Sequence, residues 1–375
     1  MSNIFLDPSC KKVVDRIYCI QITGIIEVYI MRFFHNDYNE MCHPAVLQEL
    51  TALSGTQNIG YGVDDHCKEA ADMIRKLCGN DKLAVHFLVG GTQTNLTVIA
   101  ASLRPHQAVI AADSGHISIH ETGAIEATGH KVLELPSADG KLKPEQITKV
   151  ACSQSDTMDA EHTVQPKMVY ISHPTELGTT YTKAELTAIS EACKAYNLRL
   201  FVDGARMGYG LAAADSDLTL ADFAELTDVF YIGGTKVGAM FGEAVVISNP
   251  EIAQDFRYLI KQRGGMLAKG RLLGIQFETL FEDGLYWEIS DHALKMAEIL
   301  RTALAEAGLP MQVQSPTNQL FPIVPDTLLE KLREKYAVTY MNRVDEHSSC
   351  IRLCTSWATR EEDVRAFCDD LKEMM

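Results

Sequence analysis

Residues 198–206 read LRLFVDGAR: an apolar run ends in Asp203, Gly204, Ala205 and Arg206. Such a run is typical of a strand that is buried on both faces of a parallel sheet. A carboxylate at the end of this strand would lie where open α/β sheets bind ligands. Asp-Gly is also a common turn pair, so Asp203 alone is better explained as part of a plain turn. Arg206 favours a ligand site, because a guanidinium binds a carboxylate through two hydrogen bonds.

Similar apolar runs occur on both sides of this segment. From about residue 60, short apolar runs alternate with longer helical patterns, which indicates an α/β fold with a parallel sheet covered by helices. Helices are expected at 64–77, 95–103 and 183–196, the last with a capping box formed by Thr182 and Glu185. Seven strands are expected at 84–89, 108–111, 131–135, 168–171, 198–202, 229–232 and 244–247.

Beyond Pro250 the pattern changes. Long amphipathic helices are expected at 251–283 and 285–307, followed by a break at 308–310, strands at 319–323 and 351–353, and a helix at 360–375. The charged segment 326–336 is expected to be a helix with a solvated face. These features predict three parts: an N-terminal extension (1–30), a large domain with its N-terminal segment (31–265) and a small C-terminal α+β domain (266–375).

The N-terminal extension contains a run of β-branched and aromatic residues at 17–30. It is too short to span a bilayer and contains Gln21 and Glu27, so no membrane association is expected. Neither a secretory signal nor a transit peptide fits the charges or the absence of a cleavage site. We expect one extended strand outside the working fold, with Met31 as the start of the functional chain.

Composition restricts the partners. The 375 residues include 46% hydrophobic residues, enough for about two domains. Fifty acidic against 34 basic residues give a net charge of −16, which disfavours nucleic acid and anionic membranes. A small molecule or another subunit is the expected partner. Ten cysteines form no CxxC pair and no zinc-type cluster, which indicates reduced thiols and a cytoplasmic location.

A glycine turn follows the expected strand at 84–89. It reads Gly90-Gly91-Thr92 and opens a helix, so backbone amides and the helix dipole are available to an anion such as phosphate. The turn matches neither the GxxxxGK[ST] nor the GxGxxG pattern, so no nucleotide is specifically indicated. A tight strand-to-helix turn is an equally good interpretation.

Two further groups could carry chemistry. Lys236 lies among glycines and apolar residues in YIGGTKVG (231–238), where desolvation would lower its pKa and let its amine form a Schiff base. His116, in SGHISIHETG (114–123), could stack on an aromatic cofactor or move protons. Although His120 and His130 follow, no metal-ligand spacing is present, and no metal is expected.

Taken in order, these residues resemble the pyridoxal-phosphate-dependent threonine aldolases of the β-eliminating lyase group. Gly91-Thr92, His116, Asp203 to Arg206, Lys236 and Arg352 carry the resemblance, which covers roughly residues 32–360. The family implies a fold of type I, with a mostly parallel seven-stranded sheet and a small C-terminal domain. It also implies the cofactor pyridoxal phosphate and a homodimer or homotetramer with shared active sites.

The resemblance implies a role for each residue. Lys236 would carry the cofactor as a Schiff base, and Asp203 would keep the pyridine nitrogen protonated. Gly91 and Thr92 would hold the phosphate. His116 would stack on the ring and serve as the base, directly or through a water. Arg206 would contact the cofactor and, with Arg352 and Asn36 of the Asn36-Asp37 segment, bind the substrate carboxylate.

Two segments depart from the family pattern. Where the family commonly has Asn-Thr-His, residues 172–178 read SHPTELG, so the role of His173 is open. The family's Gly-Gly-Met-Arg appears as GGML at 264–267, so its arginine would be replaced by Arg263, by Lys269 or by nothing.

The reaction implied is retro-aldol cleavage of L-threonine or L-allo-threonine to glycine and an aldehyde. Two alternatives stay open. One is β-elimination or transamination of another amino acid by the same residues. The other is a non-catalytic module that binds an anion or nucleotide at the glycine turn, which would be colourless and indifferent to Lys236.

Overall fold

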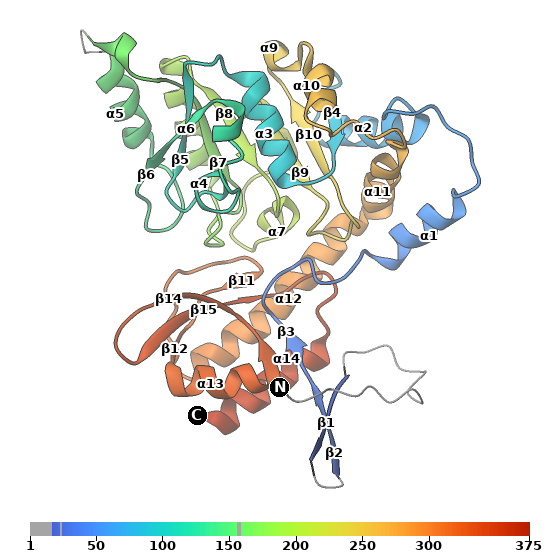
Figure 1. The fold of residues 1–375 in the computed structure, drawn as a ribbon, viewed down its shortest axis with the longest axis vertical. Helices are drawn as coiled ribbons and strands as arrows, with labels where there is room; N and C mark the ends of the chain where they lie inside the picture. Colours follow the sequence, from blue (N-terminus) through green and yellow to red (C-terminus); the bar gives the residue numbers. More distant parts are fainter. Residues whose placement is uncertain (1–16, 23–24, 156–158) are drawn as a thin grey trace.

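The computed structural model describes residues 17–22, 25–155 and 159–375. Its centre is a seven-stranded sheet in which β10 alone runs antiparallel to its neighbours (Figure 1). In sheet order the strands are β4 (Ala84–Leu88), β10 (Glu243–Ile247), β9 (Val229–Gly233), β8 (Arg199–Asp203), β7 (Gln165–Ser172), β5 (Gln107–Ala112) and β6 (Lys131–Leu135). Each coincides with one of the seven predicted strands, so the predicted sheet is confirmed.

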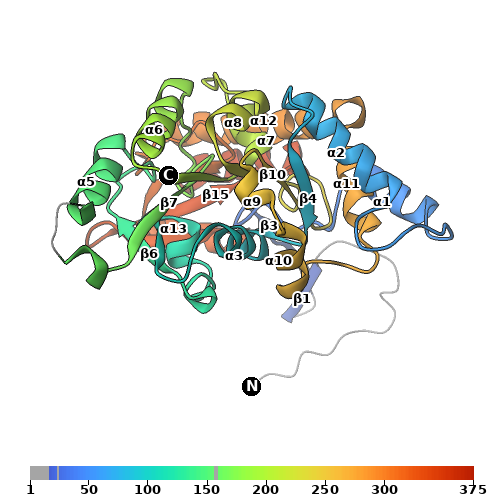
Figure 2. The same cartoon turned by 90° about the horizontal axis from the view of Figure 1, so that it is seen from above.

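Helices cover both faces of this sheet (Figure 2). One face packs against α2 (Asp65–Leu77), α5 (Pro144–Ser155), α6 (Lys183–Ala195) and α8 (Leu220–Leu226). The other packs against α3 (Gly91–Ser102), α4 (His116–Ile119), α9 (Pro250–Ala253) and α10 (Phe256–Gln262). Strand residues alternate between the two apolar clusters, as the twofold period of a strand requires. Phe230 and Ile232 belong to one cluster and Val229 and Tyr231 to the other.

Local sequence signals predicted some helix boundaries correctly. The capping box is present, since Thr182 accepts from the Glu185 amide and the Glu185 side chain accepts from the Thr182 amide. Helix α3, predicted from residue 95, starts at Gly91. The glycine turn is therefore the first turn of the helix itself.

The long helix predicted at 251–283 is wrong. The segment contains α9, α10 and α11 (Arg271–Phe281), followed by the short turn η3 (Glu282–Gly284). Asp255 and Gly264 interrupt it, because both have left-handed backbone angles (φ 58° and 76°) that a continuous helix cannot contain. The helix predicted at 285–307 is confirmed as α12 (Leu285–Glu306).

A smaller α+β layer lies below the sheet in Figure 1. Its strands are β11 (Gln319–Leu320), β12 (Ile323–Pro325), β14 (Thr339–Arg343) and β15 (Ser348–Cys354), and its helices are α13 (Asp326–Lys335) and α14 (Glu361–Met374). Helix α12 serves both cores: Tyr286 packs in the large one and Leu300 in the small one. The boundary at residue 265 stays a prediction. Helix α13 is solvated on one face and buries three leucines on the other.

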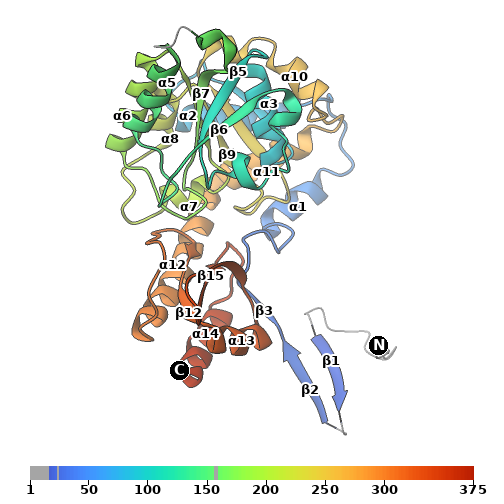
Figure 3. The ribbon, with the colours of Figure 1, turned by 60° about the vertical axis from the view of Figure 1, so that its left-hand side comes forward.

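The N-terminal part joins the small core. Strands β1 (Ile17–Ile22) and β2 (Ile25–Ile30) pair only with each other among the described residues, where one strand was expected (Figure 3). The expected run is divided at residues 23–24, which lie outside the described part of the chain. Strand β3 (Arg32–Phe33) then pairs with β13 (Tyr336–Ala337), and Phe34 packs in the small core.

The chain continues through α1 (Pro44–Ala52), which contacts α11. Short helical turns lie at η1 (Glu126–Thr128), η2 (Ala160–His162) and α7 (Met207–Leu211). Within the described ranges, no helix combines the length and apolar content needed to cross a bilayer.

Candidate active site

The predicted site residues lie at the carboxyl ends of the parallel strands. Asp203 ends β8, His116 follows β5, Lys236 follows β9 and Gly91 follows β4. Arg352 comes from β15 of the small layer. Burial lowers the pKa of His120, and the charges of Arg352 and Lys236 lower it further, so Arg352 lies near the same site. Groups from five strands therefore lie together at the crevice that open α/β sheets form beyond the carboxyl ends of their strands.

Asp203 is a buried carboxylate surrounded by donors. Its oxygens accept from Tyr170 Oη (2.5 Å), Tyr231 Oη (2.5 Å), Asn95 Nδ2 (3.1 Å) and the Ala205 amide (3.0 Å). Burial acts to raise the pKa of Asp203, but the charge of His116 and the two tyrosine hydroxyls outweigh it and leave the pKa below its usual value. The carboxylate is thus kept ionised inside the protein.

The glycine that follows Asp203 is required for a steric reason. A Cβ on Gly204 would lie 1.9 Å from the carbonyl oxygen of Tyr231 on the adjacent strand. Only glycine lets β8 and β9 approach this closely just beyond Asp203.

His116 is connected to Asp203 through two side chains. Its Nδ1 lies 2.7 Å from Glu121 Oε1, and Asn95 Nδ2 donates to that same oxygen (2.7 Å) and to Asp203. Burial lowers the pKa of His116, but the hydrogen bond to Glu121 and the charge of Asp203 outweigh it, so the net shift is upward. The imidazole is therefore fixed in orientation and easily protonated.

Lys236 has the environment of a reactive amine. Burial and the positive charge of Arg206 lower its pKa, against the opposing charges of Asp37 and Asp203. Among the described residues, none forms a hydrogen bond or ion pair with its Nζ. Its backbone is held instead, because Tyr209 Oη donates to the Lys236 carbonyl (2.6 Å). A lysine held in this way favours the neutral, nucleophilic form.

The loop of Lys236 also contacts a second buried carboxyl. Glu243 on β10 accepts from the Gly234 amide (3.3 Å), and burial raises its pKa to about 8. The sequence gave no reason to single out Glu243, because its neighbours are apolar strand residues.

The start of α3 is built for an anion. No side chain caps the helix at Gly90, and a Cβ on Gly91 would lie 3.2 Å from Tyr231 Oη. Thr94 Oγ1 is buried and has no partner among the described residues. Three features of this turn suit a phosphate group: a helix start without a side-chain cap, a Gly91 position with no space for a side chain, and a hydroxyl without a described partner. With Lys236 and Asp203 nearby, the site fits pyridoxal phosphate.

Arg206 is already paired. Its Nε and Nη2 donate to the two oxygens of the fully buried Asp37 (2.6 and 3.0 Å), and Asn318 Nδ2 also donates to Asp37 (3.0 Å). The neighbouring Asn36 uses its side chain to accept from the Tyr38 amide (2.9 Å). The substrate and cofactor roles of Arg206 and Asn36 therefore stay predictions.

Arg352 is only partly satisfied. It donates to Gln319 Oε1 (3.2 Å) and to the His35 carbonyl (2.9 Å). Its Nε is buried and has no partner among the described residues. These contacts hold the guanidinium at the crevice and leave one donor for a ligand.

The two departures from the family pattern have different outcomes. His173 is fully buried against Phe223, with ring centroids 5.0 Å apart, and burial lowers its pKa to about 3. Arg263 lies beside the anion turn, because its carbonyl accepts from Gln93 Nε2 (3.2 Å) and its buried Nε has no partner among the described residues. Lys269 is exposed.

Sequence reasoning missed the residues that support the predicted ones. They are Asn95, Glu121, Tyr170, Glu176, Tyr231 and Glu243. Tyr170 and Tyr231 sit near the ends of predicted strands, and Glu121 follows His116 by five residues, so their positions offered a signal. Asn95 offered none, because its partners lie far away in the chain.

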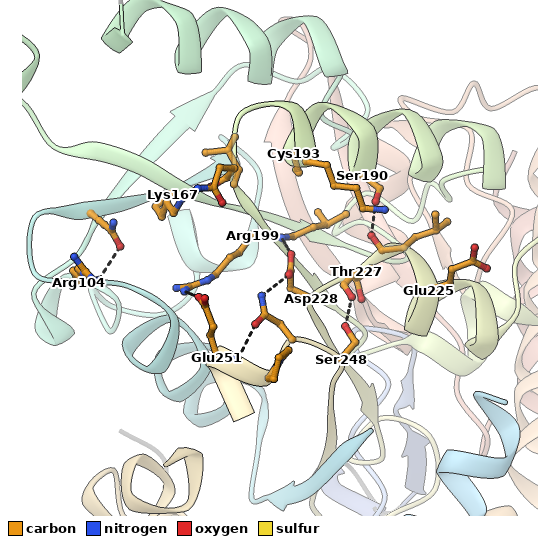
Figure 4. Close-up of a pocket in the computed structure, with 18 of the residues that line it drawn as sticks. Arg104, Lys167, Ser190, Cys193, Arg199, Glu225, Thr227, Asp228, Ser248 and Glu251 are labelled. Carbon is orange, nitrogen blue, oxygen red and sulfur yellow. Dashed lines mark hydrogen bonds and ion pairs between the residues drawn. The ribbon is translucent and has the colours of Figure 1, made fainter. Parts of the chain in front are cut away.

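Another hollow, of about 860 Å³, lies at the opposite, amino-terminal ends of the strands (Figure 4). Its polar groups are paired with each other: Arg199 with Glu251 (2.8 Å), and Asp228 with Asn249 (2.7 Å) and the Leu200 amide (2.7 Å). It contains none of the predicted site residues. Within the described part of the chain, no group of three or more His, Cys, Asp or Glu could hold a metal ion.

An α/β fold that brings a desolvated lysine, an ionised aspartate and a bare helix start together is typical of enzymes that act through an aldehyde cofactor bound to a lysine. Comparison with known proteins agrees with this class. The model of the beta-eliminating lyase family matches residues 43–327, and the chain belongs to that family.

Several of its relatives are threonine aldolases. The chain is 32% identical to the low specificity L-threonine aldolase of a Pseudomonas species, over 92% of this chain and 98% of the relative, and 30% identical to that of Pseudomonas aeruginosa, over 92% and 99%. A solved Leishmania major threonine aldolase is 47% identical, with a TM-score of 0.88 over 92% of this chain and 99% of the other. A Thermus thermophilus aspartate aminotransferase shares only the fold, at 16% identity, a TM-score of 0.67 and 92% coverage of both chains. The predicted type I fold is confirmed.

Proposed function

We propose that this chain binds pyridoxal phosphate through Lys236 and cleaves L-threonine and L-allo-threonine to glycine and acetaldehyde. The observation that carries the proposal is the environment of Lys236, whose amine has no described partner and a lowered pKa in the same crevice as the ionised Asp203. The names of its relatives support the same reaction.

Pyridoxal phosphate, when bound, supplies an aldehyde for the amino group of the substrate and a pyridine ring that withdraws electrons from Cα. Asp203 would hold the proton on the pyridine nitrogen. The amides of Gly91 and Thr92 would bind the phosphate, with Arg263 beside them. Arg352, with Arg206 and Asn36 near it, would orient the carboxylate so that the Cα–Cβ bond is placed for cleavage.

His116 would stack on the ring and accept the β-hydroxyl proton at Nε2, since Nδ1 is engaged by Glu121. Because the pKa of His116 is raised, the imidazole would keep that proton after accepting it. Lys236, once displaced by the substrate, would be a free amine that can take up a proton and, as the ammonium, return it to Cα.

Two other outcomes are distinguishable. β-Elimination or transamination would use the same residues but release a keto acid instead of glycine and an aldehyde. A binding module without chemistry would give a colourless protein. The test is the visible spectrum of the protein with pyridoxal phosphate, combined with identification of the products from L-threonine. We expect a yellow protein, colour loss in Lys236→Ala, and glycine and acetaldehyde in equal amounts. A keto acid product would contradict the aldolase proposal.

A homo-oligomer is also proposed. The segment before α2 carries several large apolar side chains that are about half or more exposed: Tyr38, Met41, Ile59, Tyr61 and Val63. The Tyr61 carbonyl accepts from Arg257 (2.9 Å), which brings this segment beside the exposed Tyr258 of α10. Apolar surface of this kind supports an interface between subunits. A chain that is active only as a monomer in solution would contradict this proposal.

A cytoplasmic location is proposed as well. Among the described residues, no two cysteines form a disulfide, which supports a reducing compartment.

A further inference from the structure

Glu176 is a carboxyl group of the crevice to which the proposed reaction assigns no role. It lies in the segment after β7, and its Oε1 accepts from Ser172 Oγ (2.6 Å) and from the His116 amide (2.9 Å). The side chain is partly buried, and no other described residue donates to its second oxygen, Oε2. One oxygen is therefore committed to the protein, while the other is left to interact with a ligand.

Two carboxyl groups share this part of the site. Asp203 and Glu176 repel each other when both are ionised, and the surrounding donors decide which one keeps the proton. Asp203 accepts four hydrogen bonds over both oxygens, whereas Glu176 accepts two on a single oxygen. The protein therefore stabilises the charge of Asp203 far better.

The other charged and titratable groups around Glu176 fit this division. Burial and Asp203 raise the pKa of Glu176, while the Ser172 hydroxyl and His116 oppose them, and the net shift is upward. The Arg206 guanidinium is nearby but is paired with Asp37. Tyr170 and Tyr181 face Glu176 with neutral hydroxyls, since burial raises the pKa of both.

The strand register says which edge of the cofactor Glu176 would meet. Ser172 on β7 is level with Asp203 on β8, so Glu176 lies on the β7 side of the aspartate. The phosphate site at Gly91 lies on the other side, next to Tyr231 of β9. With the pyridine nitrogen at Asp203 and the phosphate at Gly91, the ring edge facing β7 carries the methyl group and the 3-hydroxyl. The 3-hydroxyl is the polar atom of that edge.

We propose that Glu176 is a protonated carboxylic acid that donates a hydrogen bond from Oε2 to the 3-oxygen of pyridoxal phosphate. This inference rests on the proposed function. Its other oxygen holds the backbone of His116, so one side chain sets both the electronic state of the ring and the position of the stacking imidazole. The donated bond stabilises the form of the lysine-bound cofactor in which the 3-oxygen is negative, which absorbs at long wavelength.

The test compares two replacements in the protein loaded with pyridoxal phosphate. Glu176→Gln keeps an acceptor for Ser172 and His116 and a neutral donor for the cofactor, whereas Glu176→Met has a similar shape and no donor. We measure the ratio of the long-wavelength to the near-ultraviolet absorption band as a function of pH, and the cofactor dissociation constant.

We expect Glu176→Gln to keep the wild-type band ratio at neutral pH and to diverge from it only as the pH rises, because glutamine cannot lose the proton. We expect Glu176→Met to shift absorption to the near-ultraviolet band and to weaken cofactor binding about tenfold, the loss of one hydrogen bond. Asp222→Asn, which alters the capping carboxylate of α8, is the control and should leave the spectrum unchanged.

Two outcomes would overturn the inference: a band ratio in Glu176→Met equal to that of the wild type, or a change in Glu176→Gln at neutral pH as large as that in Glu176→Met. The second would mean that the charge of Glu176 matters and not its proton. A wild-type protein that forms no long-wavelength band would instead overturn the proposed function, and the inference with it.

Discussion

Asn95 donates to Asp203 across 3.1 Å while the same amide nitrogen donates to Glu121 across 2.7 Å. One fully buried side chain thereby connects the carboxylate proposed for the pyridine nitrogen with the carboxylate that orients His116. The two functional groups are not independent, and a change at Asn95 reaches both.

Asn95→Ala is expected to lower kcat/KM by about ten- to a hundredfold, because two buried carboxylates lose a shared donor at about 1–3 kcal/mol. Cofactor affinity should fall as well. Steady-state kinetics and cofactor titration measure both. Asn342→Ala, at an exposed position of β14, is the control, and equal kinetics for the two variants would refute the role of Asn95.

Breaking the buried ion pair between Asp37 and Arg206 should strongly destabilise the protein. Asp37→Ala leaves the guanidinium buried without its partner and should lower the free energy of unfolding by about 3–5 kcal/mol. The exposed pair between Asp326 and Arg343 is the matched comparison, and Asp326→Ala should change stability much less. Denaturant unfolding of both variants checks this, and similar losses would contradict it.

The raised pKa of His116 predicts a pH-dependent stability. Because the folded pKa lies above the unfolded value of about 6.5, the stabilisation is complete below that pH and is lost as the pH rises through the folded pKa. His116→Gln should therefore destabilise the cofactor-free protein more at about pH 6 than at about pH 9. Thermal unfolding at several pH values measures this. A loss that is independent of pH would show that Glu121 does not stabilise the imidazolium.

A substitution at Arg352 distinguishes substrate binding from cofactor binding. Arg352→Gln removes the guanidinium proposed for the amino-acid carboxylate, and KM for L-threonine should rise about ten- to a hundredfold, the value of charge-assisted hydrogen bonds. The absorption spectrum of the loaded protein should not change. Lys372→Gln, on the exposed face of α14, is the control. A bleached spectrum with unaltered KM would place Arg352 on the cofactor instead.

The sequence could predict those parts of the site that local pattern determines. Asp203, Lys236 and Gly91 follow buried strands or glycine turns, and an apolar run ending in a polar residue is visible without a structure. The supporting residues depend on pairing over distance. Asp37 and Arg206 are 169 residues apart, and only the docking of the N-terminal segment between the two layers brings them together.

The fold shows the same division. The seven strands were predictable from apolar runs bounded by turns, whereas the division of residues 251–283 into separate helices was not. The pattern at 251–283 is amphipathic throughout, and a single residue with left-handed backbone, Asp255, breaks it without any glycine or proline at that position. Similarly, α12 contributes to both cores, which its sequence alone does not reveal.

The most direct test of the central claim is to identify the lysine that carries the cofactor. The protein is loaded with pyridoxal phosphate, reduced with borohydride, digested and analysed by peptide mass spectrometry. The account predicts one modified residue, Lys236, within the peptide containing Gly233, Gly234 and Thr235. Modification of a different lysine, or of none in a protein that still cleaves L-threonine, would contradict it.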